Sequence, residues 1–219
     1  MYINHFNQTN YSVGYIHRLT KILGVKSKIR RARPGYRKSK PEYTAENVLN
    51  RDFTSTKPNE KWLSDVTEFK VIGQKQKLFL CAILDLYDNS IVSYKMSTRN
   101  DNKIVFDTFD QAIKKYPKAK PIFHSDRGYQ YTSNVFKIKL KKQGITQSMS
   151  RVGRCIDNGP MEAFWGTIKS EMYYLNKFYS LEDLKLAISN YINFYNTKRL
   201  QSKLKCLPPV VYRKQALIA

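Results

Sequence analysis

Acidic residues are scarce in this 219-residue chain: 17 Asp and Glu stand against 39 Lys and Arg, which leaves a net charge of +22. Such an excess is larger than an ordinary solvated surface carries, and nucleic acid is the partner that it favours. Ribosomal proteins and membrane-surface proteins share this charge, so composition alone leaves those classes open. Hydrophobic residues form 42% of the chain and aromatic residues 13%, which excludes wholesale disorder.

Cysteine and long apolar runs are also rare. The three cysteines, Cys81, Cys155 and Cys206, are odd in number, widely spaced and without a CxxC pair. They are typical of small buried residues in a reducing compartment and exclude a disulfide framework or a zinc site. The longest apolar run, around LFLCAILDL, is too short to span a bilayer, and the amino terminus has no signal-peptide pattern. We therefore expect a soluble cytosolic protein.

The first 57 residues differ from the rest of the chain. Apolar residues at helical spacing in YIHRLTKILGV predict a short helix, and Gly24 would end it. Residues 26–40 then hold eight basic residues and no acidic one. This segment is either a solvated linker or a phosphate-binding arm, and the run of like charge favours the arm, with Arg30, Arg31 and Arg33 as its DNA-binding residues.

The middle of the chain shows the patterns of strands, and the later part shows those of helices. Alternating or continuous apolar residues predict three strands in a meander, then a helix, a short strand that ends at Asp126, a further helix, a polar loop and two more helices. The strands are expected at 62–72, 77–87 and 90–97, and the helices at 102–116, 133–144, about 158–174 and 181–196, with one more helix possible in the tail. Strands followed by alternating strands and helices predict a mixed sheet covered on both faces.

Three of the few carboxylates occur where a hard metal ion could collect them. Asp65 lies centrally in WLSDVTEF, Asp126 ends the strand in IFHSDRGYQY, and Glu162 lies on the helix after the polar loop, with 35 residues between the last two. Mg²⁺ prefers oxygen ligands, and two-metal phosphoryl transfer needs carboxylates that converge from separate elements. Each residue also has an ordinary explanation, as a solvated strand residue, a turn cap and a surface helix residue.

The motifs around these carboxylates resemble those of the DDE transposases and integrases with an RNase H-like core. The resemblance rests on WLSDVTEF, HSDRGYQY, SMSRVGRCIDNGPMEAFWGTIKSE and YINFYNTKRLQSKL…PPVVYR, which follow in order from about residue 60 to 213. In that superfamily a first-strand Asp, a fourth-strand Asp and a helical Glu bind two Mg²⁺ ions. Within it, the chain is similar to the catalytic subunit of bacterial insertion sequences that have two overlapping reading frames and a retroviral-integrase-like core.

The resemblance implies an α/β fold in three parts. Residues 58–175 would form the RNase H-like catalytic core, with a mixed five-stranded sheet flanked by helices. A partial helical DNA-binding region and basic linker would precede it at 1–57, and a helical extension of the core would follow at 176–219. Relatives usually carry a longer amino-terminal region, so we expect a truncated copy, an internal start or a domain fragment.

The resemblance also implies the chemistry and the partners. Asp65, Asp126 and Glu162 would be the catalytic residues and the ligands of two Mg²⁺ ions, which Mn²⁺ could replace. The reaction would be DNA strand cleavage and strand transfer at element ends, by in-line phosphoryl transfer. Partners would be the DNA of the ends and of the target, a small helix-turn-helix protein from the upstream reading frame, and further copies of the chain on DNA. The protein would act in the bacterial cytoplasm, associated with the nucleoid, and not at a membrane.

Several other residues near the three carboxylates have expected roles. Lys169 lies seven residues after Glu162, so it points the same way about 10 Å further along the helix; the resemblance implies a contact with DNA phosphate, and a solvated lysine is the alternative. Arg127 and Asn158 are expected to touch DNA. Asp157 or Asn158 is expected to cap the helix that carries Glu162.

Three further titratable residues are expected not to bind the metal. His124 could share a face with Asp126, and a supporting hydrogen bond suits it better than metal ligation, because Mg²⁺ prefers oxygen. Asp85 and Asp88 are interpreted as hairpin turn residues.

Three rival functions remain open. A tyrosine recombinase is one, because the chain holds 16 Tyr and many Arg, but it would form a phosphotyrosine adduct and would not need the three carboxylates. A truncated, non-catalytic DNA-binding remnant is another. An RNase H-like nuclease is the nearest alternative, since it shares the core chemistry and lacks only strand joining.

Overall fold

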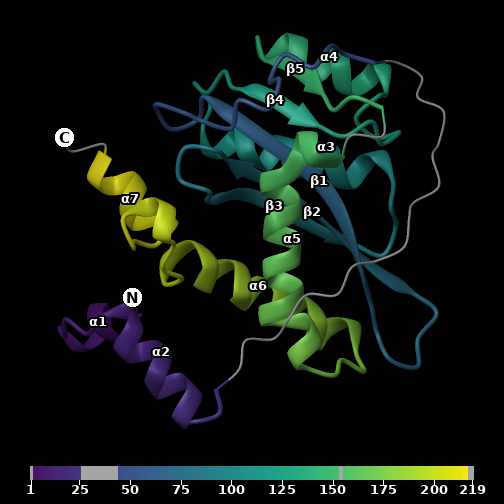
Figure 1. Cartoon of the computed structure of the whole chain (residues 1–219). Helices are drawn as coiled ribbons and strands as arrows, with labels where there is room; N and C mark the ends of the chain where they lie inside the picture. The colour runs from purple at the N-terminus through teal and green to yellow at the C-terminus, as the bar shows by residue number, and fades with distance from the viewer. Residues whose placement is uncertain (1, 26–43, 153–154, 217–219) are drawn as a thin grey trace.

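A five-stranded sheet lies at the centre of the computed structural model, which describes residues 2–25, 44–152 and 155–216 (Figure 1). The strand order is β3-β2-β1-β4-β5. Three strands form the antiparallel meander that the sequence predicts, and two short strands pair in parallel beside β1: β1 (Lys61–Lys70), β2 (Lys77–Asp85), β3 (Ile91–Ser97), β4 (Ile122–Ser125) and β5 (Thr146–Met149). The predicted mixed sheet is confirmed.

Helices cover both faces of this sheet, as predicted. One apolar cluster joins α3 and α4 to one face, and a second joins α5 and α6 to the other. Figure 1 shows α5 lying across the strands, with α6 and α7 continuing along the same side. The helices are α1 (Tyr2–Asn7), α2 (Val13–Ile22), α3 (Asn102–Lys115), α4 (Asn134–Lys142), α5 (Gly159–Glu171), α6 (Leu181–Thr197) and α7 (Pro209–Ala216), with short 3₁₀ turns η1 (Cys155–Asn158), η2 (Tyr173–Leu175) and η3 (Ser202–Leu204).

The alternation of β1 decides which of its side chains face α5. Trp62 is buried in the cluster that contains α3 and α4, whereas Leu63 and Phe69 are buried in the cluster that contains α5 and α6. Successive side chains of a strand point to opposite faces. Asp65 and Thr67 therefore lie on the α5 face, between two apolar residues that hold the strand against that helix.

Short polar side chains begin the helices where the sequence predicts them. Ser133 accepts a hydrogen bond from the Phe136 amide at the start of α4, and Ser180 accepts one from the Asp183 amide at the start of α6. These bonds satisfy amides that have no partner within the helix. Gly144, with φ +65°, follows α4, where a left-handed residue commonly ends a helix.

The interpretation of Asp85 and Asp88 as turn residues is confirmed but covers only part of their role. Each does accept a backbone hydrogen bond, from the Tyr87 and Ser90 amides respectively. Both carboxylates are also fully buried, and both pair with Arg213 of α7. The arginine is more than a hundred residues further along the chain, so no local pattern could reveal it. This network ties α7 to the turn between β2 and β3.

The amino-terminal region is described only in part. α2 is the predicted short helix, and Gly24 follows it with φ +66°. The basic arm, including Arg30, Arg31 and Arg33, lies outside the described residues. Leu49 is buried among residues of the core, and the domain boundary at residue 57 stays a prediction.

Two further expectations concern cysteines and membranes. Cys81 is buried and Cys206 is partly exposed, both as free thiols, and the side chain of Cys155 lies outside the described residues. Within the described ranges, every helix is too short or too polar to cross a lipid bilayer.

Candidate active site

The parallel pairing of β1 and β4 brings Asp65 and Asp126 together. Leu63 pairs with His124 and Ser64 pairs with Ser125, so Asp65 and Asp126 are the next residues on neighbouring strands. Adjacent strands lie about 4.8 Å apart. The two carboxylates are therefore neighbours at the carboxyl end of β4, although 60 residues lie between them in the chain.

The carboxylate of Asp65 is held on both of its oxygens. Trp165 Nε1 donates to Oδ2 at 2.9 Å, and the Val66 amide donates to Oδ1 at 2.8 Å. Burial, and then the negative charge of Asp126, raise the pKa of Asp65 to about 7, against the opposite effect of both hydrogen bonds. The charge of Glu162 adds a smaller increase to the pKa. Burial and the neighbouring charge destabilise the ionised form of Asp65, and a bound cation would stabilise it.

Asp126 follows the last residue of β4 and begins a turn. Its Oδ1 accepts a hydrogen bond from the Gly128 amide at 2.9 Å, and a Cβ on Gly128 would come within 3.0 Å of the same oxygen. Burial raises the pKa of Asp126 above its usual value. Asp126 therefore caps the turn and also lies beside Asp65. Its interpretation as a turn cap does not exclude its interpretation as a metal ligand.

Glu162 reaches this edge of the sheet from α5. Its side chain is exposed, and partial burial raises its pKa. Trp165, one turn further along α5, fixes the helix to Asp65 through its N–H group. Across residues 2–25, 44–152 and 155–216, no three His, Cys, Asp or Glu side chains lie close enough together to hold a metal ion. The structure thus pairs the two aspartates and leaves Glu162 at the rim.

The chemistry of this donor set fits a hard divalent cation. Asp65 and Asp126 offer carboxylate oxygens side by side, and the charges of Asp126 and of Glu162 at the rim raise the pKa of Asp65. Asn158 adds a buried Oδ1 that has no hydrogen-bond partner, while its Nδ2 donates to the Ser64 carbonyl at 3.3 Å. Ser64 directly precedes Asp65, so this amide lies beside the paired aspartates.

The predicted caps of α5 are wrong. Asn158 occupies the N-cap position, but its side chain makes no capping hydrogen bond. Asp157 is fully buried and accepts hydrogen bonds from the side chains of Arg51, Arg151 and Asn47. The hydrogen bonds of Arg151 hold the pKa of Asp157 well below its usual range. The carboxylate of Asp157, which the local pattern predicts as a cap of α5, thus binds arginines instead.

His124 does not support Asp126 as expected. Its Nδ1 lies 2.9 Å from Ser148 Oγ and its Nε2 lies 3.2 Å from Ser150 Oγ, and the ring is fully buried. Burial lowers the pKa of His124 to about 4, so the ring is neutral. The predicted partner is replaced because β5, a four-residue strand whose position the sequence did not reveal, pairs directly with β4.

The two expected DNA-binding cations near the carboxylates both contact the core. Lys169 Nζ donates to Thr67 Oγ1 and lies 5.3 Å from the centroid of the Phe69 ring. It is therefore on the same face of β1 as Asp65. Arg127 Nε donates to the Ser150 carbonyl at 2.7 Å. Their contacts with DNA stay predictions.

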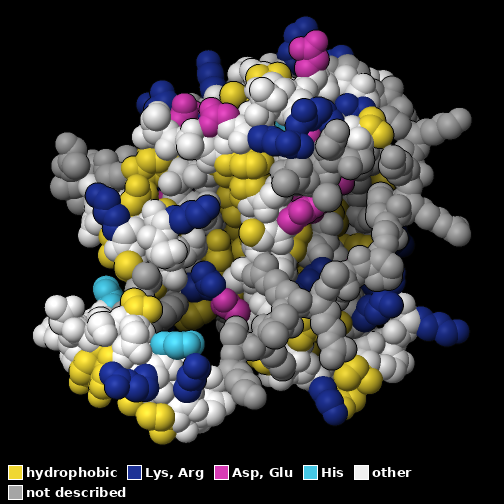
Figure 2. Space-filling view, in the orientation of Figure 1, with side chains coloured by type: hydrophobic (Ala, Val, Ile, Leu, Met, Phe, Trp, Pro, Cys, Tyr) yellow, Lys and Arg dark blue, Asp and Glu magenta, His cyan; other side chains and the backbone are white. Residues whose placement is uncertain are grey.

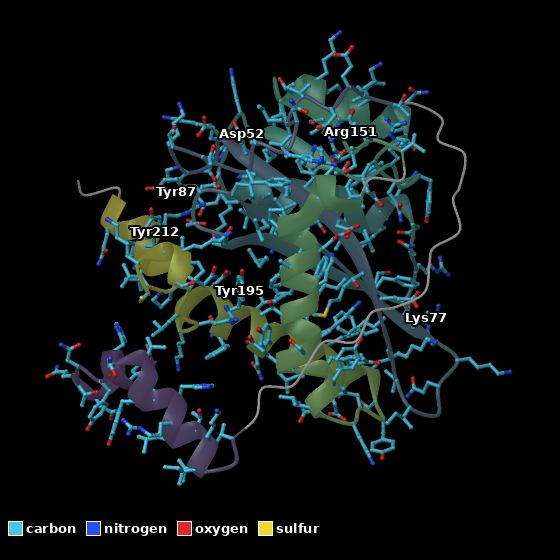
Figure 3. The ribbon with its side chains drawn as sticks, viewed as in Figure 1. Asp52, Lys77, Tyr87, Arg151, Tyr195 and Tyr212 are labelled. Carbon is cyan, nitrogen blue, oxygen red and sulfur yellow. The ribbon has the colours of Figure 1, made fainter. Side chains whose placement is uncertain are left out.

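Some residues of the site were missed by sequence reasoning. Trp165 is one of them, although its position three residues after Glu162 and its N–H group were a signal. Tyr131, also missed, is buried on the opposite face of β1, in the cluster of α3 and α4, where its hydroxyl lies 2.8 Å from Ser64 Oγ. Figure 3 shows Arg151, one of the arginines that bind Asp157, in the upper part of the molecule.

Comparison with known proteins identifies the family. An integrase core domain model matches residues 55–155, and a second integrase core domain model matches residues 162–217. The chain is 45% identical over 201 residues to the putative transposase InsK for insertion sequence element IS150 of Escherichia coli strain K12, covering 91% of this chain and 70% of the relative. The chain belongs to the insertion-sequence transposases of the DDE transposase and integrase family. It is therefore a polynucleotidyl transferase that acts on DNA.

Other relatives agree with this assignment of the transposase. A transposase-like protein of Haemophilus influenzae is 41% identical over 202 residues, covering 92% of this chain and 93% of the relative. The HTLV-2 integrase catalytic core domain, solved in complex with magnesium, superposes with a TM-score of 0.58 at 21% identity, over 73% of this chain and 99% of that one. The BIV integrase core gives a TM-score of 0.56 at 16% identity, over 73% and 97%. These structures confirm the predicted RNase H-like fold.

Proposed function

We propose that this transposase cleaves and joins DNA strands at the ends of its insertion sequence by metal-dependent, in-line phosphoryl transfer. In this proposal Asp65, Asp126 and Glu162 are the catalytic residues and hold the metal. The observation that carries the proposal is the neighbouring position of Asp65 on β1 and of Asp126 directly after the parallel strand β4, where each has a raised pKa. A bound cation would stabilise both charges, as carboxylates in metal sites require.

The residues around the carboxylates orient them for this task. Trp165 and the Val66 amide each bind a different oxygen of Asp65, so its carboxylate cannot rotate freely. The Gly128 amide binds one oxygen of Asp126. Two Mg²⁺ ions, or Mn²⁺ in their place, would supply the Lewis acidity that activates water or a 3′-hydroxyl and stabilises the leaving 3′-oxygen. Such a reaction needs no nucleophilic side chain.

Positive charge around the site would hold the DNA backbone. Figure 2 shows Lys and Arg side chains spread over the face that it displays, with few acidic side chains between them. Lys169, on the same side of α5 as Glu162, would contact a phosphate next to the scissile bond, with Arg127 and Asn158 nearby. Arg30, Arg31 and Arg33 would bind DNA further away. With each phosphate contact, the affinity for DNA falls more steeply as the salt concentration rises.

The proposal includes partners and place of action. Two element ends must meet for joining, so the protein would oligomerise on DNA; the HTLV-2 integrase core has been solved in trimeric and dimeric forms. A small helix-turn-helix protein from an upstream reading frame would help to recognise the ends. The place of action would be the bacterial nucleoid.

The test is strand cleavage and joining on labelled element-end DNA, in Mg²⁺ and in EDTA. Wild type is run beside Glu162→Gln and beside Glu182→Gln, a control that removes an exposed carboxylate of α6 which pairs with Lys185. We expect joined products in Mg²⁺ for wild type and for the control, and none for Glu162→Gln or in EDTA. Products in EDTA would contradict metal dependence. Cleavage without joining would indicate a nuclease, and binding without products would indicate a non-catalytic remnant.

A further inference from the structure

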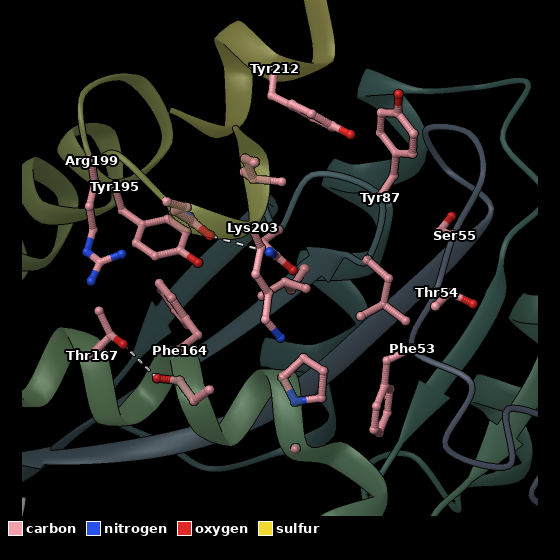
Figure 4. Close-up of a pocket in the computed structure, with 18 residues that line it drawn as sticks. Phe53, Thr54, Ser55, Tyr87, Phe164, Thr167, Tyr195, Arg199, Lys203 and Tyr212 are labelled. Carbon is pink, nitrogen blue, oxygen red and sulfur yellow. Dashed lines mark hydrogen bonds between the residues drawn. The ribbon is translucent and has the colours of Figure 1, made fainter. Parts of the chain in front are cut away.

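A cleft of about 630 Å³ lies beside α5, away from the three carboxylates (Figure 4). Its walls come from the segment before β1, the turn between β2 and β3, one side of α5, and the region from the end of α6 to α7. Its lining includes four aromatic residues and two cations: Tyr87, Phe164, Tyr195, Tyr212, Arg199 and Lys203.

The cleft and the candidate active site use different sides of the same helix. Pro160, Ala163 and Thr167 line the cleft and recur at helical spacing. At about 100° per residue, the centre of this stripe lies roughly 140° round the helix from the position of Glu162. A ligand in the cleft would therefore lie behind α5, close to the site but not at the carboxylates.

Aromatic rings stand on two walls of the cleft. Tyr87 and Tyr212 lie beside each other, with ring centroids 5.6 Å apart, and Phe164 meets Tyr195 edge to face at 4.9 Å. Figure 3 shows Tyr87 and Tyr212 next to each other, and Figure 4 shows their rings on the opposite side of the cleft from Phe164 and Tyr195. Both pairs come from elements distant in sequence, so only the tertiary fold assembles them.

The charge of the cleft is positive. Lys203 is exposed, and Figure 4 shows its side chain reaching into the cleft. Arg199 also lines the cleft, but Glu171 neutralises it through a bond of 2.6 Å. Among the described residues that line the cleft there is no Asp or Glu. An anionic ligand with a flat ring therefore fits this lining better than a cation or a purely apolar group.

We propose that this cleft binds one unpaired nucleotide of the DNA, with its base against the tyrosine rings and its phosphate near Lys203. Stacking on aromatic side chains is a general way for proteins to hold unpaired bases. A duplex hides the faces of its bases between neighbouring pairs, so only an unpaired nucleotide can use these rings. Clefts of about 300–1,000 Å³ hold ligands of nucleotide size. The inference rests on the action of the transposase on DNA, and not on the chemistry of the three carboxylates.

The experiment compares the binding of two DNA probes by fluorescence anisotropy in EDTA. One probe is an element-end duplex with a short unpaired thymidine tail, and the other is the same duplex without the tail. The proteins are wild type, Tyr212→Ala, Lys203→Ala and two controls. Tyr212→Phe keeps the ring, and Lys198→Ala removes an exposed lysine of the same region that does not line the cleft.

We expect the tail to increase affinity about ten-fold for wild type and for both controls, the size that base stacking gives. Tyr212→Ala and Lys203→Ala should lose most of this gain and still bind the tailless duplex as wild type does. Thermal melting of each variant checks folding. Iodouridine in the tail should crosslink to Tyr87 or Tyr212, as mapped by mass spectrometry, and this readout needs no variant.

Three results would overturn the inference. The tail could add no affinity in wild type, or the gain could survive in both alanine variants with crosslinks outside the cleft. The alanine variants could instead change the sedimentation of the DNA-free protein and leave DNA binding intact, which would assign the cleft to a second copy of the chain. Because EDTA prevents metal-dependent cleavage, these outcomes do not depend on whether strand transfer occurs.

Discussion

Replacing Arg213 with Met should be among the most destabilising changes in the part of the chain that the structure describes. The guanidinium pairs with Asp85 and Asp88, both fully buried, and donates to the Tyr116 hydroxyl at 2.8 Å. Removing it leaves two buried carboxylates without a counter-charge. Losing one partner of a buried ion pair costs about 3–5 kcal/mol. In a chain of this length that corresponds to a fall in melting temperature of about 6–20 °C.

The same substitution has an expected dependence on pH. Burial raises the pKa of Asp85, and Arg213 opposes that rise. Without the arginine, Asp85 takes up a proton at a higher pH than in wild type. Its buried charge then disappears as the pH falls, so the loss of stability should be smaller at pH 5 than at pH 8.

Urea unfolding of wild type and Arg213→Met at both pH values measures this effect. The free energy of unfolding of Arg213→Lys should lie between those of wild type and Arg213→Met, because an ammonium keeps the charge but lacks the forked guanidinium that binds two carboxylates. Lys103→Met is the matched control, since it breaks an exposed pair with Asp107 and should leave the free energy of unfolding close to that of wild type. An Arg213→Met protein as stable as the control variant at pH 8 would refute the role of this network in holding α7.

Three further predictions concern residues near the carboxylates. Burial lowers the pKa of His124 to about 4, so as the pH falls this histidine takes up a proton in the unfolded chain before it does in the folded protein. The free energy of unfolding should therefore fall by about 3 kcal/mol from pH 6.5 to pH 4. Urea unfolding of His124→Asn should lack this contribution to the pH dependence. Asp157→Asn should lower the free energy of unfolding by about 2–3 kcal/mol in the same assay, because the charged hydrogen bonds from Arg51 and Arg151 are lost. Unchanged stability would contradict this. Trp165→Phe keeps an aromatic side chain but removes the N–H that lowers the pKa of Asp65. Strand transfer at neutral pH should therefore drop several-fold, and an unaltered rate would exclude this role.

Local sequence patterns determined the secondary structure and much of its placement. The alternation of β1 places Asp65 on the same face as Leu63 and Phe69, and the apolar stripe of α5 leaves Glu162 at its edge, both from periodicity alone. Ser133 caps α4 as its position predicts. The ordered motifs and the spacing of 35 residues between Asp126 and Glu162 pointed to the family, which the comparisons confirm.

Only the tertiary structure decided which partners the buried charges and rings have. Arg213 meets Asp88 across 125 residues of sequence, and Arg51 meets Asp157 across 106. Local rules assigned Asp88 to a turn and Asp157 to a helix cap, because a short side chain usually bonds to its own backbone. Folding instead brought an arginine within reach of each buried carboxylate, and a charge taken out of water is stable only beside such a partner.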